Sequence, residues 1–185
     1  MNVVNLAVQT VINPAVVARQ LLDIRLGREV LWLAFFLAVV LSCLVQVGRL
    51  QFLPLQQGEL APVSESVGLY LIRSAALLLV SILAFLFAGR LLGGVATFNG
   101  IMTLIVWLQY LQIVAMLITL VLAMVLPFLM LMFSLATFVL SLYVTLHFLN
   151  EAHKFGSLWK AFGVILLAGV VAVPFVLALM PNAPV

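Results

Sequence analysis

The chain has 185 residues, of which 67% are hydrophobic and only 7% are charged, and its mean hydropathy of +1.39 excludes an ordinary soluble globular domain. Eight basic residues against five acidic ones give a net charge of +3, and they are too scattered to form a nucleic-acid-binding surface. A single cysteine, Cys43, excludes an intramolecular disulfide and a thiolate metal cluster.

Residues 1–29 are predicted to form a cytosolic segment with an amphipathic helix. Asn13 and Pro14 are typical of a helix start, and Gly27 suits its C-terminal end. The pattern of residues 1–12 is weaker and leaves open whether they extend this helix. We expect the helix to lie on the membrane surface. Its apolar face comprises Val17, Leu21 and Ile24, and its polar face comprises Arg19, Gln20 and Asp23.

Five later segments are each long and apolar enough to cross a membrane, which takes about 20 residues. The stretch from Ile101 to Leu149 is too long for one crossing, so we divide it at Pro127. Pro174 is expected to kink or end the last span. The first span begins only near Val30, so we expect an uncleaved insertion signal. The fold class is therefore an all-α membrane protein, with spans at about 30–47, 67–89, 101–126, 128–149 and 161–180, and a short tail at 181–185.

The orientation follows from the basic residues, because lysine and arginine are enriched on the cytosolic side. A cytosolic N-terminus places six of the eight inside, and five spans then place the C-terminus outside. If the two segments that meet at Pro127 are instead fused into one crossing, four spans remain and the C-terminus moves to the other side. The six are Arg19, Arg25, Arg28, Arg90, Lys154 and Lys160, and the remaining two are Arg49 and Arg73.

Arg73 is the best ionisable candidate within the predicted spans, about one and a half turns from the start of the second span. A charge at that depth is costly unless it reaches a partner or the interface. Arg73 is therefore predicted to bind an anionic lipid headgroup or to pair with Glu65. The alternative is that its long side chain only snorkels to the outer headgroups.

Two polar stripes run along the third and fourth spans at helical spacing. They predict either a polar path, with Gln109 and Gln112 as ligand contacts, or interhelical hydrogen bonding and packing of small residues. Ala84 with Ala88, and Ala168 with Ala172, have the spacing of close helix contacts. The stripes comprise Gln109, Gln112, Met116 and Thr119, and Ser134, Thr137, Ser141 and Thr145.

The two cytosolic connections between spans are further candidates for partner contact. GRLLGGVATFNG, which contains Asn99, has glycines that could cradle phosphate, but it matches no nucleotide-binding motif and indicates a tight turn. In HFLNEAHKFGSLWK, the residues His147, Glu151 and Lys154 would share a face of a continuing helix. Including His153, their spacing matches no zinc motif. No metal, cofactor or nucleophile is predicted, so these connections indicate docking or interfacial contacts.

The five-span layout, the turn GGVATFNG before the third span and the turn HKFGSLWKAF before the fifth resemble the YIP-type (Ypt/Rab-interacting) membrane proteins, particularly their prokaryotic relatives. The resemblance covers about residues 13–180. Eukaryotic members are associated with vesicle trafficking and small GTPases. Their acidic motif with Tyr and Gly has no counterpart in DIRLGREV here, so GTPase binding is not carried over. The family implies a membrane scaffold or lipid-associated role and no catalytic residues.

These observations predict a non-enzymatic scaffold or adaptor of a prokaryotic plasma membrane, which binds membrane proteins or anionic lipids in addition to the bilayer. The sequence does not indicate an oligomeric state. The alternative is a small transporter or channel that uses Gln109, Gln112 and Arg73, although few intramembrane charges argue against ion coupling. A membrane-embedded lipid enzyme ranks last, because no polar catalytic cluster is apparent.

Overall fold

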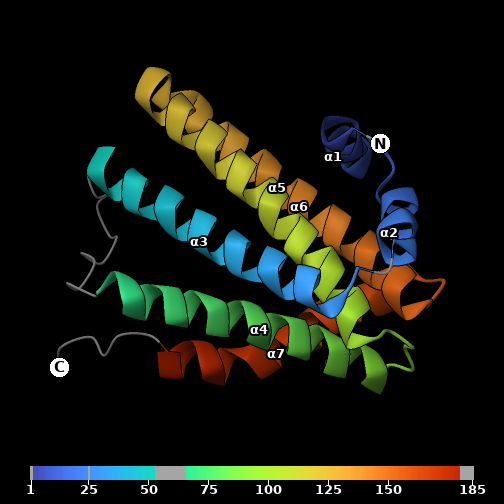
Figure 1. Ribbon diagram of the computed structural model, residues 1–185. Coiled ribbons are helices and arrows are strands. Elements are labelled where there is room, and N and C mark those ends of the chain that lie inside the picture. The colour runs from blue at the N-terminus through green and yellow to red at the C-terminus, as the bar shows by residue number, and fades with distance from the viewer. Residues whose placement is uncertain (1, 25, 53–65, 180–185) are drawn as a thin grey trace.

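The structure is a computed structural model that describes residues 2–24, 26–52 and 66–179, and this part of the chain is all-helical (Figure 1). Helices α3 to α7 are long and apolar enough to cross a membrane, as predicted. The helices are α1 (Val3–Ile12), α2 (Pro14–Asp23), α3 (Arg28–Phe52), α4 (Val67–Leu91), α5 (Phe98–Val125), α6 (Pro127–His153) and α7 (Leu158–Leu179).

Several helix ends differ from the sequence prediction. α3 continues to Phe52, so residues 48–52, which were expected in a loop, are helical. Gly27 does not end α2. Instead, its carbonyl accepts a hydrogen bond from the Leu31 N–H at 3.0 Å, at the start of α3. α7 continues through Pro174 to Leu179. Around Pro127 the prediction agrees with the structure, because α5 ends at Val125 and α6 begins at Pro127.

α2 is the amphipathic helix expected from the sequence, and it packs on α5 and α6. Val17 and Ala18 are fully buried and Leu21 nearly so. Ile24, expected on the same face, is the residue that follows the helix and is 53% exposed. The apolar face of α2 is thus covered by protein, which fixes the N-terminal segment to the bundle.

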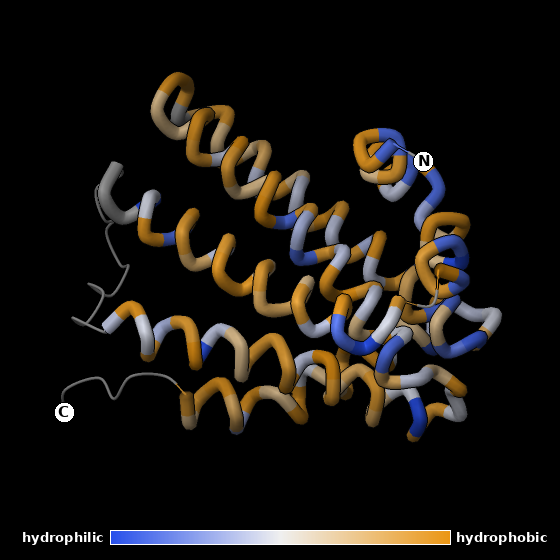
Figure 2. The backbone as a smooth tube through the Cα atoms, viewed as in Figure 1, coloured by the Kyte–Doolittle hydropathy of each residue, from blue (hydrophilic) through white to orange (hydrophobic). Residues whose placement is uncertain are grey.

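The most extensive helix contact pairs α4 with α7, and α5 packs against both α6 and α3. Figure 2 shows apolar residues along the five long helices and hydrophilic ones mainly at the end with α2 and the α4–α5 and α6–α7 turns. The turns at this end use glycine: Gly93 has φ +84° and Gly156 has φ +63°, where a side chain would be strained. The N-terminal helices and these two turns therefore define one end of the molecule.

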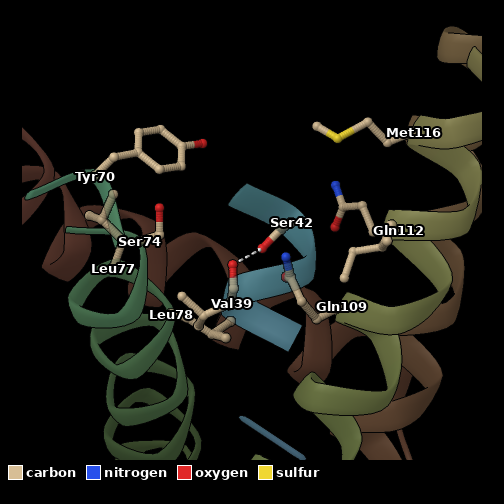
Figure 3. Close-up of a pocket in the computed structure, with 10 residues that line it drawn as sticks. Val39, Ser42, Tyr70, Ser74, Leu77, Leu78, Gln109, Gln112 and Met116 are labelled. Carbon is tan, nitrogen blue, oxygen red and sulfur yellow. Dashed lines mark hydrogen bonds between the residues drawn. The ribbon is translucent and has the colours of Figure 1, made fainter. Parts of the chain in front are cut away.

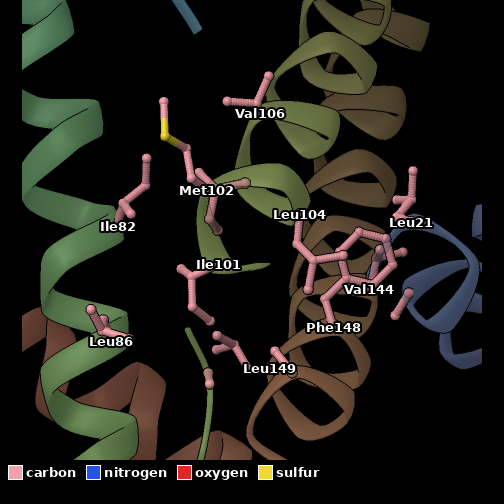
Figure 4. Packing of buried hydrophobic residues seen from close by; sticks show 14 of the residues in the cluster. Leu21, Ile82, Leu86, Ile101, Met102, Leu104, Val106, Val144, Phe148 and Leu149 are labelled. Atoms are coloured by element: carbon pink, nitrogen blue, oxygen red, sulfur yellow. The ribbon is translucent and has the colours of Figure 1, made fainter. Parts of the chain in front are cut away.

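The buried core is concentrated at that same end (Figure 4). Its long-helix residues come from the first half of α3, α5 and α7 and from the second half of α4 and α6. Toward the opposite end, α3 and α4 diverge from the α5–α6 hairpin (Figure 1). The bundle is therefore tightly packed at one end and opens at the other. Representative core residues are Phe35, Ile82, Ile101, Met102, Phe148, Leu149 and Val164.

Candidate functional site

Two cavities lie between the long helices, beyond the packed core. The first, of about 310 Å³, is lined by α3, α4 and α5. The second, of about 260 Å³, is lined by α3, α5 and α6. Gln112 and Met116 line both. The two cavities are therefore adjacent, and α5 contributes side chains to both of them.

The first cavity is formed where polar residues from three helices face one space (Figure 3). Gln109, Gln112 and Met116 follow one another at helical spacing on α5. Tyr70 and Ser74, one turn apart, face them from α4, and aliphatic residues such as Leu77 and Leu78 complete the wall. The arrangement provides both polar and apolar contacts to a molecule between the helices.

The Gln109 and Gln112 amides make no hydrogen bond to another residue in the described part of the chain. Ser42 differs, because its hydroxyl donates to the carbonyls of Ala38 at 2.8 Å and Val39 at 3.0 Å. A primary amide has two donors and an acceptor oxygen. The two glutamines thus offer unused hydrogen-bonding groups at the centre of the site.

The second cavity brings the two predicted polar stripes together. Thr119 from α5 faces Ser134, Thr137 and Ser141 from α6. The Thr119 and Thr137 hydroxyls each donate to the carbonyl four residues earlier, at 2.8 Å, so their oxygens keep acceptor capacity. Thr145 lines neither cavity and donates to the Ser141 carbonyl at 2.7 Å. In the described residues the hydroxyl hydrogen bonds of Thr119, Thr137 and Thr145 thus stay within their own helices, and the stripes do not make the predicted interhelical hydrogen bonds there.

Arg49 lines the second cavity, whereas Arg73 lines neither. The Arg73 guanidinium lies 5.4 Å from the centre of the Tyr70 ring, a cation–π contact. Its predicted partner Glu65 lies outside the described residues. Arg73 therefore flanks the first cavity through its contact with Tyr70, which lines that cavity.

The remaining predicted site residues lie at the packed end and do not form one cluster. Asn99 is exposed in the first turn of α5. The His147 ring packs edge-on against Tyr143, with centroids 4.7 Å apart. Glu151 approaches Arg19 of α2 at 3.7 Å. Lys154 does not share their face as predicted, because α6 ends at His153 and Lys154 adopts a left-handed cap conformation with φ 56°.

His153 is 1% exposed at the end of α6. A Cβ added at Gly89 or Gly94 would overlap its ring, and the ring stacks on Phe155 with centroids 5.1 Å apart. The glycines of the α4–α5 connection therefore allow close packing of helices, as the sequence indicated. In the described residues no three His, Cys, Asp or Glu side chains are grouped to hold a metal ion.

Four cavity residues were not predicted as site residues from the sequence: Ser42, Arg49, Tyr70 and Ser74. Tyr70 and Ser74 lie four residues apart on either side of Arg73, and this spacing is a signal that could have identified their face of α4. Ser42 and Arg49 gave no such signal, because which face of α3 meets α5 depends on the packing.

Long apolar helices packed around polar interhelical cavities define a helical integral membrane protein. The chain belongs to the Yip1 family, since the family model described as Yip1 domain matches residues 8–180, in agreement with the resemblance noted above. No curated protein and no solved structure matches the chain.

Proposed function

We propose that this Yip1-family protein is a non-enzymatic membrane protein that binds a lipid of the surrounding bilayer in its two interhelical cavities. The observation that supports the proposal most directly is the position of Gln112. It follows Phe98 by fourteen residues and precedes Val125 by thirteen, so it lies at the middle of α5. Its amide faces both cavities without a hydrogen-bond partner among the described residues.

A polar group in that position requires a partner. An amide in an apolar environment without a hydrogen bond costs about 1–3 kcal/mol by mutational measures, and no bulk water exists in the hydrocarbon layer. Gln112 is also exposed at the protein surface, so a molecule in the bilayer can reach it. A lipid that inserts its headgroup into a cavity supplies ester carbonyl or phosphate oxygens as the acceptors that the amide lacks.

The walls of the cavities suit the two parts of an amphiphile. The amides of Gln109 and Gln112 and the Arg49 guanidinium offer donors to a polar headgroup. Leu77, Leu78 and other aliphatic side chains offer contact to acyl chains. A water-soluble solute would make no favourable contact with these apolar side chains. The lining therefore favours a lipid over the solute of a transporter.

The packed end is proposed to face the cytosol. The end that carries α2 and the two turns holds most of the described cations (Figure 1). Arg49 and Arg73 lie in the halves of α3 and α4 that are farther from this end. The excess of basic residues supports this orientation. The cavities then open toward the outer half of the bilayer. The cations at the packed end are Arg19, Arg28, Arg90, Lys154 and Lys160.

Photo-crosslinking tests the lipid site. The full chain is reconstituted in phosphatidylethanolamine–phosphatidylglycerol vesicles that contain a phosphatidylglycerol with a diazirine in its acyl chain, and labelled peptides are mapped by mass spectrometry. We expect labelling of cavity residues such as Met116 and Leu78, and its loss when Gln109 and Gln112 are both replaced by Leu.

Gln46→Leu is the matched control, because Gln46 is a span glutamine that lines neither cavity. Its labelling should equal that of the unmodified chain. Labelling spread evenly over the outer apolar surface, and unchanged in the double variant, would overturn the proposal. A solute flux that depends on Gln109 and Gln112 without site-specific labelling would favour the transporter alternative instead.

A further inference from the structure

Helix α1 presents three distinct faces around its axis. Leu6 and Thr10 are 8% and 0% exposed and pack toward the bundle. Asn2, Asn5 and Gln9 form a polar face at spacings of three and four residues. The third face is apolar and uncovered: Val4, Val8 and Val11 are 68%, 51% and 45% exposed. No residue of α1 is charged.

The position of α1 along the bundle is fixed by a hydrogen bond. The Trp107 Nε1–H of α5 donates to Thr10 Oγ1 at 3.1 Å. α1 is seen nearly end-on in Figure 1, where the long helices lie across the view. It therefore crosses the bundle and does not run along it, and it contacts α5 at a defined height.

The length of α5 places that height within the hydrocarbon layer when the helix is centred in the membrane. α5 has 28 residues, which corresponds to about 42 Å against a hydrocarbon thickness of about 30 Å. With α5 centred, about 6 Å projects at each end. Trp107 follows Phe98 by nine residues, or about 13 Å. The backbone of Trp107 thus lies about 7 Å inside the boundary, and α1 lies near that level, within the range of depths typical of interfacial helices.

We propose that α1 is an in-plane membrane wedge, with Val4, Val8 and Val11 inserted among the acyl chains of the leaflet at the packed end of the bundle. The exposed valines form an apolar surface, and the absence of charged side chains on α1 removes the largest cost of this depth. The inference goes beyond the proposed lipid site, because α1 lines neither cavity.

A wedge in one leaflet has a mechanical consequence. It adds cross-section to that leaflet only, whereas the spans add cross-section to both. The protein should therefore prefer membranes in which that leaflet is convex, and insertion of amphipathic helices is sensitive to curvature in general.

Depth measurement by spin labels tests the proposal in the full chain. In a Cys43→Ala background, single cysteines replace Val8, Asn5 and, as a lipid-exposed reference, Leu166 of α7, which is 57% exposed. In phosphatidylethanolamine–phosphatidylglycerol vesicles, we expect the Val8 label to match the Leu166 label in access to oxygen. The Asn5 label should be more accessible to a water-soluble nickel complex.

A Val8 label as accessible to nickel as the Asn5 label would overturn the wedge, and so would one shielded from both reagents, which would indicate a second protein chain on this face. Membrane tubes drawn from giant vesicles test the consequence, with the packed end on the convex leaflet. We expect enrichment in the tube that is lost with Val8→Asn and kept with Asn5→Ser. Equal density of the unmodified chain in tube and vesicle would contradict it.

Discussion

The imidazole of His153 occupies the space that a side chain on Gly94 would need. Gly94 follows α4 in the chain, whereas His153 ends α6. We expect Gly94→Ala to lower the free energy of unfolding by about 1–3 kcal/mol, because a buried ring has no room to move aside. Denaturant titration of the solubilised protein measures the change.

The cost of Gly94→Ala in a His153→Ala background shows whether that cost comes from overlap of the new methyl group with the His153 ring. Removal of the ring should reduce the cost of Gly94→Ala by at least about 0.5 kcal/mol, as expected for residues in contact. Gly169→Ala is the control, since nothing lies within 4 Å of an added Cβ there. An equal cost of Gly94→Ala in both backgrounds would contradict the overlap.

Thr10→Val removes the acceptor for Trp107 with little change in shape. An unpartnered buried donor costs about 1–3 kcal/mol. We expect faster hydrogen exchange in α1 and unchanged exchange in α7. Thr145→Val serves as control, because the Thr145 hydroxyl bonds only within its own helix, and equal effects of the two substitutions would refute a role for the contact.

Tyr110→Phe tests the link between α5 and α3. The Tyr110 hydroxyl donates to the Ala34 carbonyl at 2.9 Å, and its loss should lower stability by about 0.5–1.5 kcal/mol. Tyr143→Phe should be neutral within about 0.5 kcal/mol, because Tyr143 is 42% exposed. Thermal unfolding in detergent compares the pair, and equal midpoints would show that the bond contributes nothing.

Arg19→Gln should leave stability nearly unchanged. The Arg19 side chain is 60% exposed and its contact with Glu151 is 3.7 Å long, and exposed ion pairs contribute about 0–1 kcal/mol. We expect a loss below about 0.5 kcal/mol, measured by the same titration. A larger loss would show that the pair fixes α2 to α6.

The number of spans could be predicted because hydropathy and length decide it, and Pro127 marked the hairpin because proline suits the first turn of a helix. The end of α3 was misplaced, because Gly48 and Arg49 look like loop residues although the helix accommodates both. Gly27 was misassigned since a glycine suits either end of a helix, and only the backbone geometry shows which.

The site was predictable only within each helix. The spacing of Gln109 and Gln112 identified one face of α5, but nothing in a stripe tells which helix will face it. Tyr70 and Ser42 enter the same cavity from α4 and α3. In lipid, helix pairing depends on the fit of side chains and not on hydrophobicity, so such cross-helix sets appear only in the folded bundle.

The pairing of α4 with α7 has a consequence for biosynthesis. α4 emerges from the ribosome second among the spans, but its main packing partner is the last span to be synthesised. At about 5–20 residues per second, the wait is on the order of ten seconds. During that time the face of α4 that will meet α7 must be covered by lipid or by the membrane insertion machinery. Nascent chains truncated before Leu158 should accordingly be recognised as unfinished by membrane quality control.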